Sequence, residues 1–282
     1  MKVVRAEQLG LCFGVRRAVK LLKEAVSRHG EVETLGPVAH NRMLVETLAR
    51  AGVKPVNELS EVRGKLLAVT THGIGPATMS EIAALGIEVI DTTCPIVRRA
   101  QRTAGELAEA GFDVVIFGEA GHSEVKGLLG YAGHRGRAAL EVSRSYDPKE
   151  SSLRLGIISQ TTQAYSAFAE FAVELVRATG PLTREVRLVN TLCQVTQRQQ
   201  EAALSLARSS ELMLVIGGRH SANTRHLVEI CSSIVETHLV ETADEIDRSW
   251  LTGKEQVGIT AGASTPDEAV EALVARLASP DC

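Results

Sequence analysis

Three cysteine-containing stretches decide the expected fold: Cys12-Phe-Gly-Val-Arg-Arg17, Cys94-Pro-Ile-Val-Arg-Arg99 and Cys193-Gln-Val-Thr-Gln-Arg198. Each has an arginine five residues after its cysteine and opens a pattern of apolar residues at helical spacing. A short apolar segment then follows and ends at a glycine 24 residues beyond the cysteine, at Gly36, Gly118 and Gly217. Self-similarity at constant spacing indicates a threefold structural repeat.

Each repeat contains two further apolar segments that we interpret as strands. One precedes the cysteine, over 3–6, 88–91 and 186–190, and the other spans 66–71, 155–159 and 257–260. The chain ends in a helical pattern over 266–278, so we expect the N-terminal strand to complete the third repeat. These patterns predict an α/β protein of three similar lobes in a pseudo-threefold trefoil. The expected lobes are residues 12–93, 94–189 and 190–282, the last completed by 1–11.

Polar side chains follow the predicted strands and mark one common site. His40, His122 and Ser221 each stand four residues beyond one of the three glycines. Helix starts and the carboxyl ends of parallel strands meet at one edge of a sheet, where open α/β sheets bind ligands. If the three lobes face inward, the cysteines surround one cavity whose other members are His40, His72, His122, Glu124, Thr161, Ser221, Asn223 and Ser264.

The chemistry of three thiols at helix starts favours an iron–sulfur site. A helix N-terminus carries partial positive charge, which we expect to lower the pKa of each thiol. Converging thiolates without comparable imidazoles suit iron and sulfur better than zinc, which takes four protein ligands in closed sites. A [4Fe–4S] cluster with three cysteines would leave one iron open to substrate. Cys231, in an apolar helix, and Cys282, the last residue, are interpreted as core and tail.

Composition excludes several classes of partner. The net charge of −3 and an aromatic content of 3% argue against nucleic-acid binding. The longest apolar runs are about five residues, far below the roughly 20 of a membrane helix, and no signal-like segment follows Met1, so we expect a cytoplasmic protein. Neither a P-loop nor a GxGxxG pattern occurs, while helix starts near Asn41, Ser123 and Asn223 would suit a small phosphorylated ligand.

Nine segments carry a resemblance to a known family, in order across nearly the whole chain: GLCFGVRRAV (10–19), GPVAHNRMLV (36–45), THG (71–73), DTTCP (91–95), GHSEVKG (121–127), SQTT (159–162), TLCQVTQRQ (191–199), GGRHSANTRHL (217–227) and TAGASTP (260–266). They resemble the 4-hydroxy-3-methylbut-2-enyl diphosphate reductases of the methylerythritol phosphate route to isoprenoids. The fold of that family is a three-lobed trefoil around a central cluster, which agrees with the repeat.

The resemblance implies a reaction and a role for each site residue. Cys12, Cys94 and Cys193 would hold one [4Fe–4S] cluster whose open iron takes the hydroxyl oxygen of (E)-4-hydroxy-3-methylbut-2-enyl diphosphate. Reductive loss of that hydroxyl would give isopentenyl and dimethylallyl diphosphate, with electrons from a ferredoxin or flavodoxin. The diphosphate would lie against His40, His72, His122, Ser221, Asn223 and Ser264. Glu124 would supply protons, with His122 and Thr161 also in the catalytic set, Thr161 orienting the hydroxyl, and Thr162 and Thr196 as nearby supports.

One departure and two alternatives accompany this interpretation. Many relatives read Ser-Ser-Asn where this chain reads Ser221-Ala222-Asn223, so one hydroxyl contact is missing and only the Ala222 backbone can donate. A three-cysteine [4Fe–4S] hydro-lyase would use the open iron without net electrons, but it would need carboxylate-binding arginines in the cavity. A non-catalytic sensor of a phosphorylated ligand would have no need of Glu124.

Overall fold

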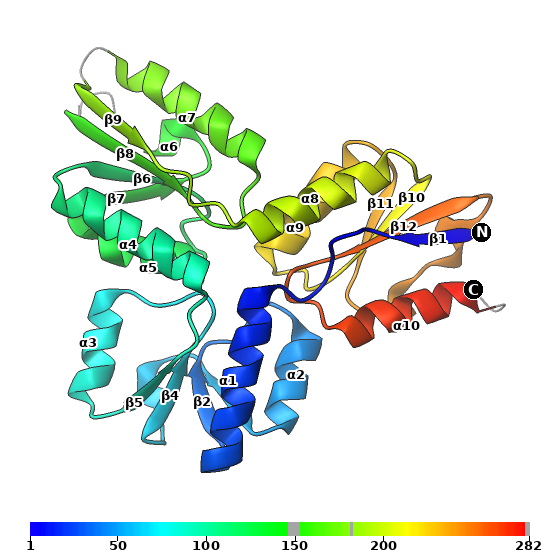
Figure 1. Cartoon of the computed structure of the whole chain (residues 1–282), viewed down its shortest axis with the longest axis horizontal. Coiled ribbons are helices and arrows are strands. Elements are labelled where there is room, and N and C mark those ends of the chain that lie inside the picture. The colour runs from blue at the N-terminus through cyan, green and yellow to red at the C-terminus, as the bar shows by residue number, and fades with distance from the viewer. Residues whose placement is uncertain (146–152, 181–182, 280–282) are drawn as a thin grey trace.

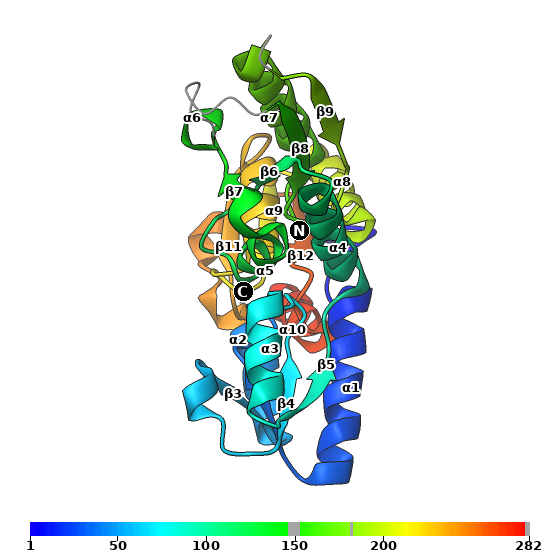
Figure 2. The ribbon, with the colours of Figure 1, turned by 90° about the vertical axis from the view of Figure 1, so that its left-hand side faces the viewer.

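The chain folds into three lobes arranged around a common centre (Figure 1). The computed structural model describes residues 1–145, 153–180 and 183–279, so Cys282 lies outside the described residues. Each lobe holds a four-stranded sheet whose strand pairs are all parallel. The molecule is flat: Figure 2 shows it edge-on, as a thin slab.

The three sheets repeat one strand order. The first sheet has the order β3 (Val53–Val56), β2 (Val32–Leu35), β4 (Leu66–Val69) and β5 (Glu88–Asp91). The second has β7 (Gly136–Ala139), β6 (Asp113–Phe117), β8 (Arg154–Ser159) and β9 (Glu185–Leu188). The third has β11 (Thr237–Val240), β10 (Leu212–Ile216), β12 (Gln256–Ala261) and β1 (Lys2–Arg5). The N-terminal strand therefore takes, beside β12, the place that β5 and β9 take in the other sheets.

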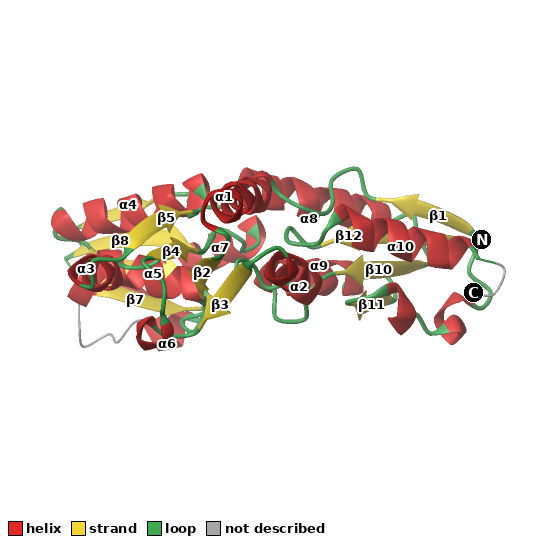
Figure 3. Ribbon diagram, turned by 90° about the horizontal axis from the view of Figure 1, so that it is seen from below, coloured by secondary structure: helices red, strands yellow, loops and turns green. Residues whose placement is uncertain are grey.

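Ten α-helices among the described residues cover the sheets: α1 (Phe13–His29), α2 (Arg42–Arg50), α3 (Pro76–Ala84), α4 (Pro95–Glu109), α5 (Ser123–Ala132), α6 (Val142–Ser145), α7 (Tyr165–Thr179), α8 (Gln194–Ala207), α9 (Ala222–Ser232) and α10 (Asp267–Ala278). Short 3₁₀ turns are η1 (Leu59–Glu61), η2 (Gly133–Arg135), η4 (Ala243–Glu245) and η5 (Arg248–Leu251). Seen from below, α1, α4 and α8 lie along one broad face of the slab (Figure 3). None of the described helices is long and apolar enough to cross a membrane.

Burial explains why these segments take these conformations. Every residue of β10 is buried, because helices cover both faces of a parallel sheet and leave no polar side. On α1 the buried Val15, Ala18, Leu22 and Ala25 recur at steps of three and four residues, which places them on one face. That face packs against the first sheet in a single apolar core.

The structure confirms the predicted fold class of three parallel α/β lobes. The nine predicted strands are present, with ends shifted by at most two residues, as is the C-terminal helix. The edge strands β3, β7 and β11 were not predicted. They are four residues long, each has only one buried residue, and Pro55 interrupts β3, so they lack a continuous apolar pattern. The lobe boundaries 12–93, 94–189 and 190–282 stay a prediction.

Candidate active site

The three repeat cysteines occupy equivalent positions at helix starts. Cys12, Cys94 and Cys193 are the N-cap residues of α1, α4 and α8. Their backbone N–H groups donate to carbonyl oxygens two residues beyond the ends of β12, β4 and β8, at 2.9, 3.0 and 2.8 Å; the acceptors are Ala263, Thr71 and Thr161. The sequence repeat therefore extends to the hydrogen bonds that fix each cysteine backbone.

A second set of hydrogen bonds holds the segments through which the chain passes from one lobe to the next. The Arg17 guanidinium on α1 donates to the Thr93 carbonyl at 3.3 Å, immediately before Cys94. Arg99 on α4 donates to the Asn190 carbonyl at 2.8 Å, three residues before Cys193. The Gln199 amide on α8 donates to the Gly10 carbonyl at 2.9 Å, two residues before Cys12. These three contacts, here called the interlobe ring, hold the segment that leads to each cysteine against the first helix of the preceding lobe.

Two of the sulfur atoms come close together where α1 meets Cys94. A Cβ atom built on Gly14 would lie 2.7 Å from the Cys94 sulfur and 3.9 Å from the Cys12 sulfur. Glycine at this position is therefore required for the backbone of α1 to approach Cys94.

Burial acts against ionisation of these thiols. It raises the pKa of Cys12 and Cys94, and the neighbouring thiols raise it further, although N–H groups of the first helical turn lower it. The expectation that the helix start would lower the pKa of each thiol is therefore wrong for these two residues, because desolvation is the larger effect. A coordinating cation would reverse the balance, since metal binding deprotonates a thiol.

All predicted site residues line one cavity at the centre of the trefoil. It contains about 690 Å³ of space not occupied by protein atoms, a volume that includes open solvent at its mouth. The lining includes Cys12, Cys94, Cys193, His40, His72, His122, Glu124, Thr161, Thr162, Thr196, Ser221, Asn223 and Ser264. Sequence reasoning missed the apolar part of the wall, formed by Val15, Ala39, Ile96, Val97 and Ala263, because these residues read as ordinary core positions.

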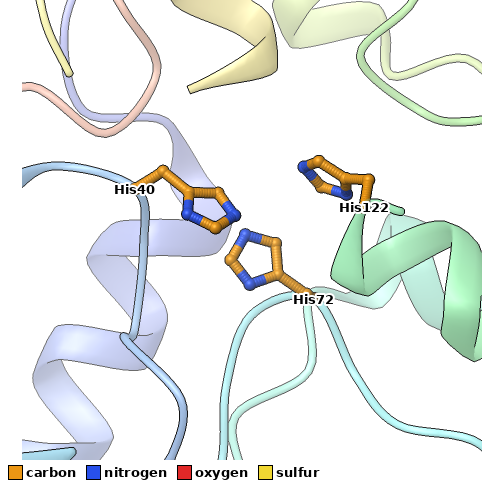
Figure 4. Close-up of side chains that lie close together, drawn as sticks. All are labelled: His40, His72 and His122. Atoms are coloured by element: carbon orange, nitrogen blue, oxygen red, sulfur yellow. The ribbon is translucent and has the colours of Figure 1, made fainter. Parts of the chain in front are cut away.

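Three imidazoles face one another on one side of the cavity (Figure 4). The ring centroids of His40 and His72 are 4.7 Å apart, and the His122 centroid lies 5.4 Å from that of His40 and 5.5 Å from that of His72. One ring nitrogen from each residue lies within 4.8 Å of the other two. His40 precedes α2, His72 follows β4 and His122 caps α5, so this histidine trio joins the first lobe to the second.

The trio is neutral near pH 7 and offers N–H donors. Burial lowers the pKa of His40, lowers that of His72 strongly and lowers that of His122 to about 4. The Glu124 backbone N–H donates to His122 Nδ1 at 3.1 Å, so the proton of the neutral ring is on Nε2. A metal ion would need a lone pair at Nε2, whereas this tautomer presents an N–H group there. Each neutral ring of the trio carries one N–H group, and three such donors close together suit an anion.

Glu124 is the buried carboxylate of the cavity. Its side chain lies in the first turn of α5 and is 2% exposed. The Thr161 backbone N–H donates to Glu124 Oε1 at 2.6 Å, and the Thr161 hydroxyl donates to Oε2 at 3.0 Å. Burial nevertheless raises the pKa of Glu124 to about 7, although both Thr161 contacts lower it. A carboxyl with that pKa exchanges a proton near neutral pH, which general acid catalysis requires.

Polar groups without partners face the cavity beside the histidine trio. Asn223 is 4% exposed and Ser264 6%, and among the described residues neither side chain has a hydrogen-bond partner for its polar atoms. Ser221 caps α9 by accepting the Thr224 N–H at 3.4 Å, which leaves its own hydroxyl proton free to donate. Buried polar groups are normally satisfied, so these residues indicate a site for a polar ligand at the start of α9.

An ion pair beside the histidine trio was not predicted. Arg225 Nη2 on α9 lies 2.7 Å from both carboxylate oxygens of Glu119, which follows β6, so the pair links the third sheet's lobe to the second. Arg225 lowers the pKa of both His40 and His122, while Glu119 raises it. The two residues are 106 positions apart, and nothing local in the sequence marks them as partners.

The comparisons with known proteins agree with this geometry. Residues 3–278 match the family model described as LytB protein. The 4-hydroxy-3-methylbut-2-enyl diphosphate reductase of Dehalococcoides mccartyi strain CBDB1 is 43% identical over 277 residues, covering 98% of each chain. That of Geobacter metallireducens is 37% identical, covering 98% of this chain and 97% of its own.

Solved structures give the same result. A structure of (E)-4-hydroxy-3-methyl-but-2-enyl diphosphate reductase, described as the terminal enzyme of the non-mevalonate pathway, matches with a TM-score of 0.70 and 36% identity, covering 98% of this chain and 99% of that one. The reductase from Plasmodium falciparum shares the fold with a TM-score of 0.89 at 22% identity, covering 99% and 88%. The chain belongs to the LytB protein family.

Proposed function

We propose that the chain reduces (E)-4-hydroxy-3-methylbut-2-enyl diphosphate to isopentenyl and dimethylallyl diphosphate. The single observation that carries the proposal is the meeting of three cysteines, one buried carboxylic acid and an anion site in one cavity. The reaction consumes two electrons and two protons and releases water. Relatives that match this chain over nearly their full length carry the name of that reductase.

The cysteines fit the proposed [4Fe–4S] cluster. Cys12, Cys94 and Cys193 supply three soft sulfur ligands at the starts of separate helices, and none has a disulfide partner in the part of the chain that the structure describes. When bound, the cluster would supply the electrons and a Lewis-acidic iron for the substrate hydroxyl. The interlobe ring would keep the three cysteine backbones at constant separation, and the apolar wall would limit access of water.

The diphosphate would lie between the histidine trio and the start of α9. His40, His72 and His122 offer N–H donors there, and the unpartnered Asn223 and Ser264 would gain partners, with Ser221 as a further donor. The backbone N–H of Ala222 stands in for the missing hydroxyl of the Ser-Ser-Asn pattern. This arrangement anchors the substrate by groups remote from the reacting bond.

Glu124 would deliver the protons. Its pKa of about 7 keeps much of it protonated at neutral pH, and Thr161 holds both carboxyl oxygens so that the acid points in one direction. The same Thr161 hydroxyl can instead turn to the substrate hydroxyl and orient it. Electrons would come from a one-electron carrier such as a ferredoxin or flavodoxin.

The observed wall of the cavity argues against the hydro-lyase. Such an enzyme needs arginines to bind substrate carboxylates, and the cavity lining among the described residues contains none. The paired Glu124 and Thr161 argue against a simple sensor, because a buried carboxyl whose pKa is raised beside a ligand site is typical of a catalytic acid.

The decisive experiment replaces the acid without removing the fold. Glu124→Gln can still accept the Thr161 N–H, so we expect normal iron content and substrate affinity with turnover reduced by about 10²–10⁴-fold. Turnover would be measured anaerobically with reduced methyl viologen, and the exposed Glu46→Gln on α2 is the control. Unchanged turnover in Glu124→Gln would remove the proton-donor role.

A cysteine series tests the metal site separately. We expect Cys12→Ser, Cys94→Ser and Cys193→Ser each to lower iron per chain after anaerobic reconstitution. Cys231→Ser is the matched control because that thiol is fully buried in the third lobe's core and does not line the cavity. Zinc in place of iron in protein purified without oxygen would contradict the proposed cluster.

A further inference from the structure

The basic residues that follow each repeat cysteine have no role in the proposed chemistry. The first eight residues of α1, α4 and α8 contain six arginines and one lysine against one glutamate. The whole chain has a net charge of −3. Positive charge is therefore concentrated on three short segments of a protein that is acidic elsewhere.

These segments share one face of the molecule. In Figure 1 the starts of α1, α4 and α8 point toward the centre, and Figure 3 shows the same three helices along one broad face. Each helix start carries one of the repeat cysteines as its N-cap. The basic residues of these segments therefore lie along the three helices that begin beside the cysteines on this face. We call this surface the helix-start face.

Much of the positive charge on the helix-start face is not neutralised. Arg16 pairs with Asp267, Arg98 with Asp91 and Lys20 with Glu24. Arg17 and Arg99 donate to backbone carbonyls, which accept a hydrogen bond but carry no net charge. The remaining arginines are both exposed and have no ion-pair partner among the residues that the structure describes; they are Arg102 and Arg198.

Two exposed aromatic rings accompany these charges. Phe13, the first residue of α1 and the neighbour of Cys12, is 61% exposed, as is Tyr165 at the start of α7. The Tyr165 N–H donates to the Gln197 side chain on α8 at 3.2 Å, which places Tyr165 beside the third helix start. Exposed aromatic residues among arginines are the composition that protein interfaces favour.

We propose that the helix-start face is the docking surface for an acidic one-electron carrier protein. The arginines would attract the carrier's carboxylates, and Phe13 and Tyr165 would form the apolar contact. The inference rests on the proposed function, which needs two electrons per substrate. Two reduced carriers, each losing one electron, together with two protons, convert the alcohol into the alkene product and one water.

Charge reversal tests this surface. The double variant Arg102→Glu/Arg198→Glu and each single variant would be compared with Arg50→Glu, an exposed arginine at the end of α2 and outside the three helix starts. At low ionic strength we expect the double variant to lower the second-order rate constant with reduced flavodoxin about tenfold or more. The affinity for oxidised flavodoxin, measured by calorimetry, should fall in parallel. Arg50→Glu should match the wild type in both measurements.

A small reductant separates this proposal from the proposed function. With reduced methyl viologen, a cation that needs no basic surface, the rate of the double variant should not fall. Equal flavodoxin affinity and equal flavodoxin-dependent rates in wild type and double variant would overturn the docking surface. Absence of turnover with methyl viologen in the wild type would instead count against the proposed function, while flavodoxin binding would still test the surface.

Discussion

Gly14 permits the closest approach between the first two lobes, and its replacement by alanine tests the arrangement of the cysteines. The added Cβ would lie 2.7 Å from the Cys94 sulfur and 3.3 Å from the Cys94 Cβ. Ordinary contacts between such atoms are 3.5–4.0 Å, so either the Cys94 side chain rotates away or α1 moves by roughly 1 Å. Both responses displace a sulfur from the position that the proposed cluster requires.

The expected change in stability combines two opposing effects. Alanine in place of glycine stabilises a helix by about 1 kcal/mol. Overpacking a filled site costs about 1–3 kcal/mol. Gly14→Ala should therefore be less stable than wild type by about 0–2 kcal/mol.

Gly105, inside α4, is the matched control. A Cβ there would meet Tyr131 only at 3.8 Å, an ordinary contact. Gly105→Ala should therefore gain about 1 kcal/mol, so the two variants should differ by about 1–3 kcal/mol.

Two measurements check this prediction. Urea denaturation of iron-free protein gives the free energies of unfolding, and iron per chain after anaerobic reconstitution reports the site. We expect Gly14→Ala to lose most of its iron and Gly105→Ala to keep all of it. A Gly14→Ala protein with full iron and the stability gain of Gly105→Ala would refute the close approach of α1 to Cys94.

Three other changes test separate contacts. Because the pKa of Glu124 rises from 4.5 to about 7 on folding, the folded state binds the extra proton and loses about 3 kcal/mol of stability as pH rises through that window. The difference in unfolding free energy between wild type and Glu124→Gln should therefore change with pH from 4.5 to 7 and be constant outside it; a flat difference would contradict the raised pKa. Gln199→Leu removes the interlobe bond to the Gly10 carbonyl, and its iron should dissociate faster under a chelator than in Gln256→Leu, whose amide bonds a surface carbonyl. Cys231→Ser should lower stability by about 1–3 kcal/mol at unchanged iron content, because it buries a hydroxyl among apolar side chains; iron loss would make Cys231 part of the metal site.

The sequence predicted the parts of the structure that repeat. The constant spacing from Cys12, Cys94 and Cys193 to the strand-end glycines placed the helix starts and the central strands correctly, because buried parallel strands and helix starts have strong local patterns. The edge strands have no such pattern and were missed.

Contacts between lobes could not be predicted from local sequence patterns either. The pairing of Glu119 with Arg225 and the ring-to-ring distances in the histidine trio depend on how the lobes meet. The pKa values of Cys12 and Cys94 depend on how deeply the assembled centre is buried, which helix position alone does not reveal.

Because of the interlobe ring, the relative positions of the three sulfur atoms depend on all three lobes being assembled. Each lobe holds the segment ahead of another lobe's cysteine, so no lobe expressed by itself would present its thiol in the working position. Loss of one hydrogen bond of the interlobe ring loosens the segment that leads to the next cysteine. Because that cysteine caps the helix that makes the following bond of the ring, the following cysteine is loosened too. Release of the proposed cluster and loss of alignment between the lobes should therefore occur together, as one cooperative event.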